Sequence, residues 1–137
     1  MRHPDLDRYF DRLHQRTNKL GRKLVFMLEL SVLDTGPGFA ATMRQRPDAD
    51  TDDIQCITEC FVDYASSKPG PNSGLGLGRL LRQVRALDGF IRFRTSTAEA
   101  VFAGSSAQRD SSPMPHIAGD LPKVVGTVLT IAIPLAL

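Results

Sequence analysis

A carboxylate stands at the end of a long, mostly apolar run. The run over residues 24–33 leads directly into Asp34, and Gly36 and Gly38 follow. Burying an ionised carboxylate costs several kcal/mol unless hydrogen-bond donors meet it. We therefore expect Asp34 to be buried and to face a ligand edge rich in N–H groups, such as the amino edge of a purine. An ordinary strand-to-loop turn is the alternative.

A second glycine-rich segment lies further along the chain. Residues 66–78 are rich in Ser, Pro and Gly, and they end in Gly74-Leu75-Gly76-Leu77-Gly78 before an amphipathic pattern. Alternating glycines let successive backbone N–H groups converge on one anion, and the helix that follows adds its free N–H groups and positive dipole end. The segment is therefore a candidate phosphate-binding loop. Lys68 is either a mobile cation for a terminal phosphate or an ordinary loop lysine.

The two glycine segments, in this order and with a polar stretch between them, resemble a known family. They are similar to the ATP-binding domain shared by sensor histidine kinases, DNA gyrase, mismatch-repair ATPases and the large heat-shock chaperones, the GHKL superfamily. The likeness covers about residues 22–134. It implies a Bergerat-type fold, which is an α/β two-layer sandwich of a mixed β-sheet with helices on one face, with residues 40–73 as an ATP lid.

The resemblance also assigns roles to residues. It implies that Asp34 accepts a hydrogen bond from the adenine amino group, that Gly36 and Gly38 shape the base pocket, and that Thr127 completes it. The phosphates would be held by the second glycine segment, namely Lys68, Gly74, Leu75, Gly76, Leu77 and Gly78. The implied ligands are ATP or ADP, with Mg²⁺ as the accompanying ion.

One element of the family pattern is missing. Members carry, on a helix ahead of the first glycine segment, an Asn that coordinates magnesium and often a Glu that prepares the reaction. The helix expected over residues 4–20 has no Glu and no such spacing. Asp7 and Asp11 lie one helical turn apart and are the weak alternative as ligands, against a solvated acidic face. No metal ligand and no catalytic residue is assigned.

These observations leave the activity open. The leading expectation is an adenine-nucleotide-binding domain that hydrolyses ATP or transfers its phosphoryl group to a partner. The alternatives are a nucleotide-sensing or partner-binding module that has lost turnover, and a truncated piece of a longer kinase-like chain. A dinucleotide-binding oxidoreductase is disfavoured because no strand leads straight into Gly74 and no ribose-binding acid follows at the expected distance.

Other reactive residues are few. Cys56 and Cys60 would lie on one side of a helix, but no nearby histidine or second cysteine pair completes a zinc site, so we expect reduced structural thiols. His14 lacks the sequence context of a phosphoacceptor histidine.

The elements that must position these residues follow from periodicity. Helical spacing predicts helices over about 4–20, from 54 to 61 and over 77–87, the last ending before Gly89. Strands are expected over 24–34, in a hairpin of 90–95 with 99–103, and over 124–134, where Pro134 stops the strand. Residues 104–122 are expected to form an exposed loop.

Length and composition set the outer limits. The 137 residues suffice for a single domain with its own core. A formal net charge of +2, without a dense basic run, argues against nucleic acid as a partner. Because no apolar run approaches the length of a membrane span and no signal core begins the chain, we expect a cytoplasmic protein. The sequence says nothing of its oligomeric state.

Overall fold

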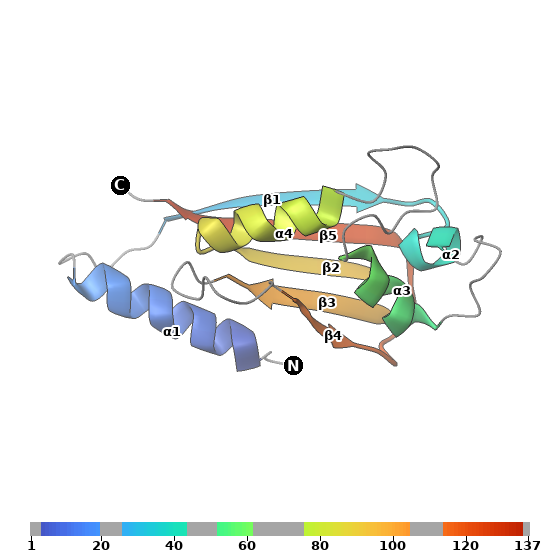
Figure 1. The fold of residues 1–137 in the computed structure, drawn as a ribbon, viewed down its shortest axis with the longest axis horizontal. Coiled ribbons are helices and arrows are strands. Elements are labelled where there is room, and N and C mark those ends of the chain that lie inside the picture. The colour runs from blue at the N-terminus through green and yellow to red at the C-terminus, as the bar shows by residue number, and fades with distance from the viewer. Residues whose placement is uncertain (1–3, 20–25, 44–51, 62–75, 105–113, 136–137) are drawn as a thin grey trace.

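The computed structural model describes residues 4–19, 26–43, 52–61, 76–104 and 114–135, and its fold is shown in Figure 1. In chain order the helices are α1 (Pro4–Lys19), α2 (Phe39–Met43), α3 (Asp53–Cys60) and α4 (Gly76–Ala86). The strands are β1 (Phe26–Asp34), β2 (Phe90–Ser96), β3 (Ala98–Ala103), β4 (His116–Ala118) and β5 (Val124–Leu135). The predicted α/β composition is confirmed.

The described strands form a single sheet in the order β1-β5-β2-β3-β4. Every neighbouring pair is antiparallel, so the expected mixed sheet is wrong. The hairpin geometry explains the difference, because β2 and β3 are joined through Thr97 alone, and β5 returns between β1 and β2. β1 is therefore an edge strand.

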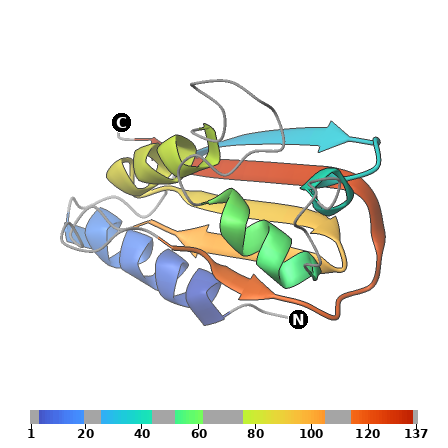
Figure 2. The same cartoon turned by 45° about the vertical axis from the view of Figure 1, so that its right-hand side comes forward.

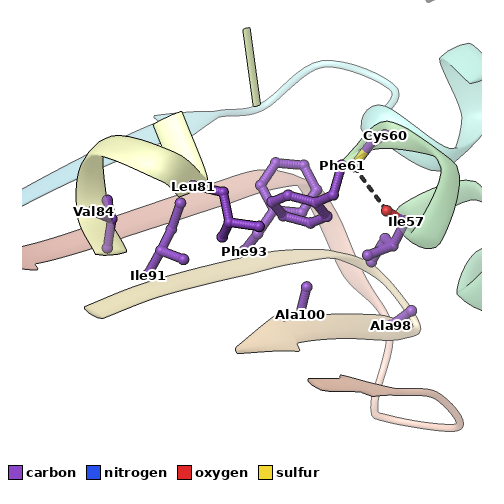
Figure 3. Close-up of a cluster of buried hydrophobic side chains, with 9 residues drawn as sticks. All are labelled: Ile57, Cys60, Phe61, Leu81, Val84, Ile91, Phe93, Ala98 and Ala100. Carbon is purple, nitrogen blue, oxygen red and sulfur yellow. Dashed lines mark hydrogen bonds between the residues drawn. The ribbon is translucent and has the colours of Figure 1, made fainter. Parts of the chain in front are cut away.

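The main core lies between the sheet and helices α3 and α4. Because directly opposed residues of antiparallel strands point to the same face, Ile91 and Phe93 of β2 share one face with Ala98 and Ala100 of β3. Figure 3 shows these side chains meeting the apolar stripes of the two helices, contributed by Ile57, Cys60, Phe61, Leu81 and Val84. We call this side of the sheet the helical face.

Helix α1 packs on the opposite face. Its buried Tyr9 and Leu13 contact Phe90 and Val101, whose side chains alternate with those of the main core. The Tyr9 hydroxyl donates a hydrogen bond of 2.9 Å to the carbonyl of Asp88, in the turn between α4 and β2. The expectation that helices cover only one face is therefore wrong for α1.

The segment predicted to be a lid contains packed structure. Ile57, Cys60 and Phe61 of α3 and its C-terminal end are buried in the main core, so this part of residues 40–73 is firmly anchored. Cys56 and Cys60 are free thiols and both are buried, and burial raises the pKa of Cys60 above its usual range. Residues 44–51 and 62–73 lie outside the described part of the chain.

Most predicted elements are present, with three differences. Helix α2 lies where the sequence predicted no helix. Strand β4 occupies part of the segment expected to be an exposed loop, because His116, Ile117 and Ala118 pair with β3. Pro134 does not stop the last strand, since it lies opposite Met27 within the pairing of β1 and β5. No helix in the described ranges has the length and hydropathy needed to span a membrane.

Candidate functional site

The structure brings Asp34 and Thr127 side by side. They are opposite one another at the end of the β1–β5 pairing, and Thr127 is in turn opposite Thr95 of β2. All three side chains belong to the helical face, because they continue the alternation that places Val32, Leu129 and Phe93 there. One end of this face therefore carries a polar row across three strands.

The turn after β1 is built by close approach of the backbone. The amide of Gly36 donates a hydrogen bond of 2.9 Å to Oδ1 of Asp34, which closes the turn on the side chain. Gly38 and Gly126 both have positive φ, +86° and +78°. A Cβ on Gly38 would come within 2.9 Å of the Gly126 carbonyl oxygen, and one on Gly126 would overlap the carbonyl of Asp34. These glycines are required by the fold itself.

A buried hydroxyl network locks α2 onto this end of the sheet. The amide of Phe39 donates to the Oγ1 atoms of both Thr95 and Thr127, each at 3.0 Å. Thr127 donates to Thr95 at 3.3 Å, and Thr95 donates to the carbonyl of Gly126 at 3.1 Å. Sequence reasoning missed Thr95, which is fully buried. The sequence does contain a signal for Thr95, since the alternation of β2 places this threonine on the face that forms the core.

Asp34 itself is exposed, so the predicted burial of its carboxylate is wrong. The physical reason is the place of β1 at the sheet edge, where none of the described helices covers the end of the strand. Oδ1 is held by Gly36, whereas Oδ2 has no hydrogen-bond partner among the described residues. The carboxylate therefore does not require a ligand for stability, but it presents a fixed acceptor to one.

The second glycine segment is only partly within the described ranges. Gly76, Leu77 and Gly78 form the first turn of α4, whereas Lys68, Gly74 and Leu75 lie outside the described residues. α4 runs antiparallel to β2, and its 11 residues span about 16 Å. It therefore begins at the same end of the sheet as Thr95, and it packs against β2 (Figure 1).

Gly76 is exposed, and a Cβ at this position would meet no atom within 4 Å. Gly78, by contrast, is buried where α4 meets the sheet. Packing within the described residues thus accounts for Gly78, while it leaves the glycine at position 76 without a structural requirement.

The described residues do not fit a magnesium site. They contain no group of three His, Cys, Asp or Glu side chains that could hold a metal ion. Asp7 and Asp11 are exposed on α1, which packs on the face opposite to Asp34. They cannot replace the missing magnesium ligands at this site, and no metal-dependent step is derived for it.

Two surface hollows among the described residues lie away from the polar row. One of about 570 Å³ lies between α1 and the β3–β4 side of the sheet, and its lining includes Arg8, Arg12 and His116. A smaller one of about 360 Å³ lies on the same helix, beside Phe10 and Met27. Neither is lined by a residue of the polar row. Because arginine side chains line the larger hollow, it is a rival position for an anionic ligand.

Comparisons with family models, with curated proteins and with solved structures give no match to this chain.

Proposed function

We propose that this chain binds an adenine nucleotide, with the base at the polar row formed by Asp34, Thr127 and Thr95. The observation that supports the proposal is the pairing of Asp34 with Thr127, which are 93 positions apart in the chain. The sequence resemblance implies that both residues form the base pocket. Their side-by-side placement on one exposed end of the sheet does not follow from their separation in the chain.

The chemistry of the row suits the amino edge of adenine. Oδ2 of Asp34 accepts hydrogen bonds only, so it selects a donor such as the exocyclic amino group. The Thr127 hydroxyl donates to Thr95 and its oxygen accepts the Phe39 amide, which leaves one lone pair to accept from a bridging water. The N-terminal turn of α4 offers free backbone N–H groups toward the phosphates. Hydrolysis is not part of the proposal, because the described residues supply no magnesium site.

The test compares ATP with ITP, in which an oxygen replaces the purine amino group. The wild-type protein should bind ATP about 10-fold to 150-fold more tightly than ITP in calorimetry, the range for a charge-assisted hydrogen bond. Asp34→Asn should remove this preference, since an amide can donate to the ITP oxygen. Glu29→Gln is the matched control, because Glu29 lies on the same strand and the opposite face.

Equal affinity for ATP and ITP in the wild-type protein, or an unchanged preference in Asp34→Asn, would refute the proposed role of Asp34. Phosphate release should be followed in the same samples. Release that Asp34→Asn abolishes would show that the chain turns ATP over, and would overturn the restriction to binding.

A further inference from the structure

A stripe of large apolar side chains lies exposed along β1. Phe26, Leu28, Leu30 and Val32 are 52%, 55%, 57% and 52% exposed, and alternation places all of them on the helical face. Leu135, opposite Phe26 on β5, is 45% exposed. We call these five residues the β1 stripe. In Figure 2, β1 forms one edge of the sheet, at the top of the view.

The size of the β1 stripe matches an interaction surface. Five half-exposed side chains present roughly 400–500 Å² of apolar area, in the range where patches on single chains mark binding sites. From Phe26 to Val32 the strand rises about 20 Å. A helix of about 14 residues has the same length.

One side of the stripe has an apolar wall. The Cα of Arg85 lies 2.8 Å from the position that a Cβ on Gly104 would take, so this flank of α4 faces the end of β3. At 100° per residue, Leu80 and Leu87 lie on the other flank, toward β5 and β1. Leu87 is 50% exposed, which extends the apolar surface from the floor of the sheet onto the helix.

A positive charge lies beside this surface on α4. Arg79 is the arginine of α4 nearest the flank that bears Leu80 and Leu87, whereas Arg82 and Arg85 lie toward the flank that faces β3. The exposed carboxylate of Asp34 lies at the end of the stripe, beyond Val32. Arg79 is exposed and lies on the outward side of the helix, next to the flank that bears Leu80 and Leu87. A group lying on the stripe beside α4 is therefore favoured if its own outer rim is acidic.

We propose that the β1 stripe binds an amphipathic helix of a partner protein, with its apolar side on the stripe and acidic residues next to α4. This inference does not depend on nucleotide binding. A second copy pairing through the edge of β1 would leave the stripe uncovered, because the helical faces of the two sheets would continue side by side. Face-to-face packing of two copies is obstructed by α2, α3 and α4, which stand on the same face (Figures 1 and 2).

The proposal is tested with a fluorescein-labelled model peptide of about 16 residues, with Leu at helical i, i+3, i+4 and i+7 spacing and Glu on the rest of its surface. Fluorescence anisotropy should show saturable binding, and Leu30→Asn should weaken it more than about tenfold. The matched control is Leu33→Asn, on the opposite face of the same strand, where Leu33 is 67% exposed. Binding to this control should be unchanged.

The charge preference gives an independent reading. A peptide with Lys in place of Glu should bind the wild-type protein more weakly, and Arg79→Glu should reverse the order of the two peptides. Equal binding of a sequence-scrambled peptide would overturn the proposal, as would equal weakening by Leu30→Asn and Leu33→Asn. A wild-type dimer in sedimentation equilibrium that Leu30→Asn dissociates would also overturn it, in favour of a second copy.

Discussion

At the scale of single residues, the candidate site is organised by the hydroxyl of Thr95. It accepts the Phe39 amide and donates to the Gly126 carbonyl, so it ties the start of α2 to β5 next to Thr127. The side chain of Asp34 is held separately, by a hydrogen bond from the amide of Gly36. The carboxylate thus has a fixed direction although it lies in solvent.

Thr95→Val should destabilise the protein by about 2–3 kcal/mol, because a nearly isosteric change leaves the buried Gly126 carbonyl without its donor. Urea denaturation measures the loss. Thr130→Val is the control, since the Thr130 hydroxyl contacts Ser31 at the exposed surface. An equal, small loss in both variants would show that the network does not hold this end of the sheet.

Gly126→Ala should cost about 3–4 kcal/mol, since its positive φ and the contact with the Asp34 carbonyl both exclude a side chain. Gly76→Ala should leave stability unchanged or raise it by up to about 1 kcal/mol, because the site is open and helical. Thermal or urea unfolding separates the two. A neutral Gly126→Ala would contradict the described approach of β5 to the turn after β1.

At the scale of elements, α1 is joined to the sheet by one buried aromatic residue. Tyr9 packs on Phe90, with ring centroids 6.2 Å apart, and its hydroxyl bonds to Asp88. Burial, together with the nearby Asp88 carboxylate, raises the pKa of Tyr9 to about 12. The folded state therefore keeps the proton that the unfolded chain loses near pH 10.

This pKa predicts a stability loss at high pH. The protonated Tyr9 hydroxyl contributes to the free energy of unfolding, and this contribution is fully present below pH 10 and is lost as the pH rises through about 12. Between pH 9 and pH 11.5 the free energy of unfolding of the wild-type protein should fall by about 1–2 kcal/mol more than that of Tyr9→Phe, which has no titrating hydroxyl at this position. Parallel urea titrations at the two pH values measure the difference. A constant gap between the two proteins would contradict the burial of this hydroxyl.

Periodicity predicted most elements but not how they are covered. The alternation of residues 24–33 places Leu28, Leu30 and Val32 together, as the structure confirms, yet nothing local indicates that this face is exposed. The burial of Asp34 was wrong for the same reason: strand order, not strand sequence, makes β1 an edge.

Long-range contacts also explain what sequence reasoning missed. Asp53 precedes the helix predicted from residue 54 and was assigned no role from the sequence; it is buried, and its Oδ2 accepts the amide of Thr97 at 3.0 Å. This contact ties α3 to the β2–β3 turn and joins two residues that are 44 positions apart. The first glycine segment was visible locally, but the residue of β2 that holds its end, Thr95, was not.

At the scale of the whole molecule, the two faces of the sheet have different tasks. One face is partly covered by α1, while the helical face carries the main core, the polar row and the exposed β1 stripe. The proposed nucleotide site lies at one end of β1, and the proposed helix-binding surface lies along its length. A partner helix on the stripe would therefore lie next to the base site without occupying it.

The most direct test of the central claim is a map of nucleotide binding on the ¹⁵N-labelled protein. With ATP raised to about 1 mM, enough to populate even a weak site, amide signals should shift at Gly36, Phe39 and Thr127. These residues should shift together, and Asp34→Asn should remove the effect. Shifts confined to Arg8, Arg12 and His116, around the rival hollow, or no shift at all, would contradict it.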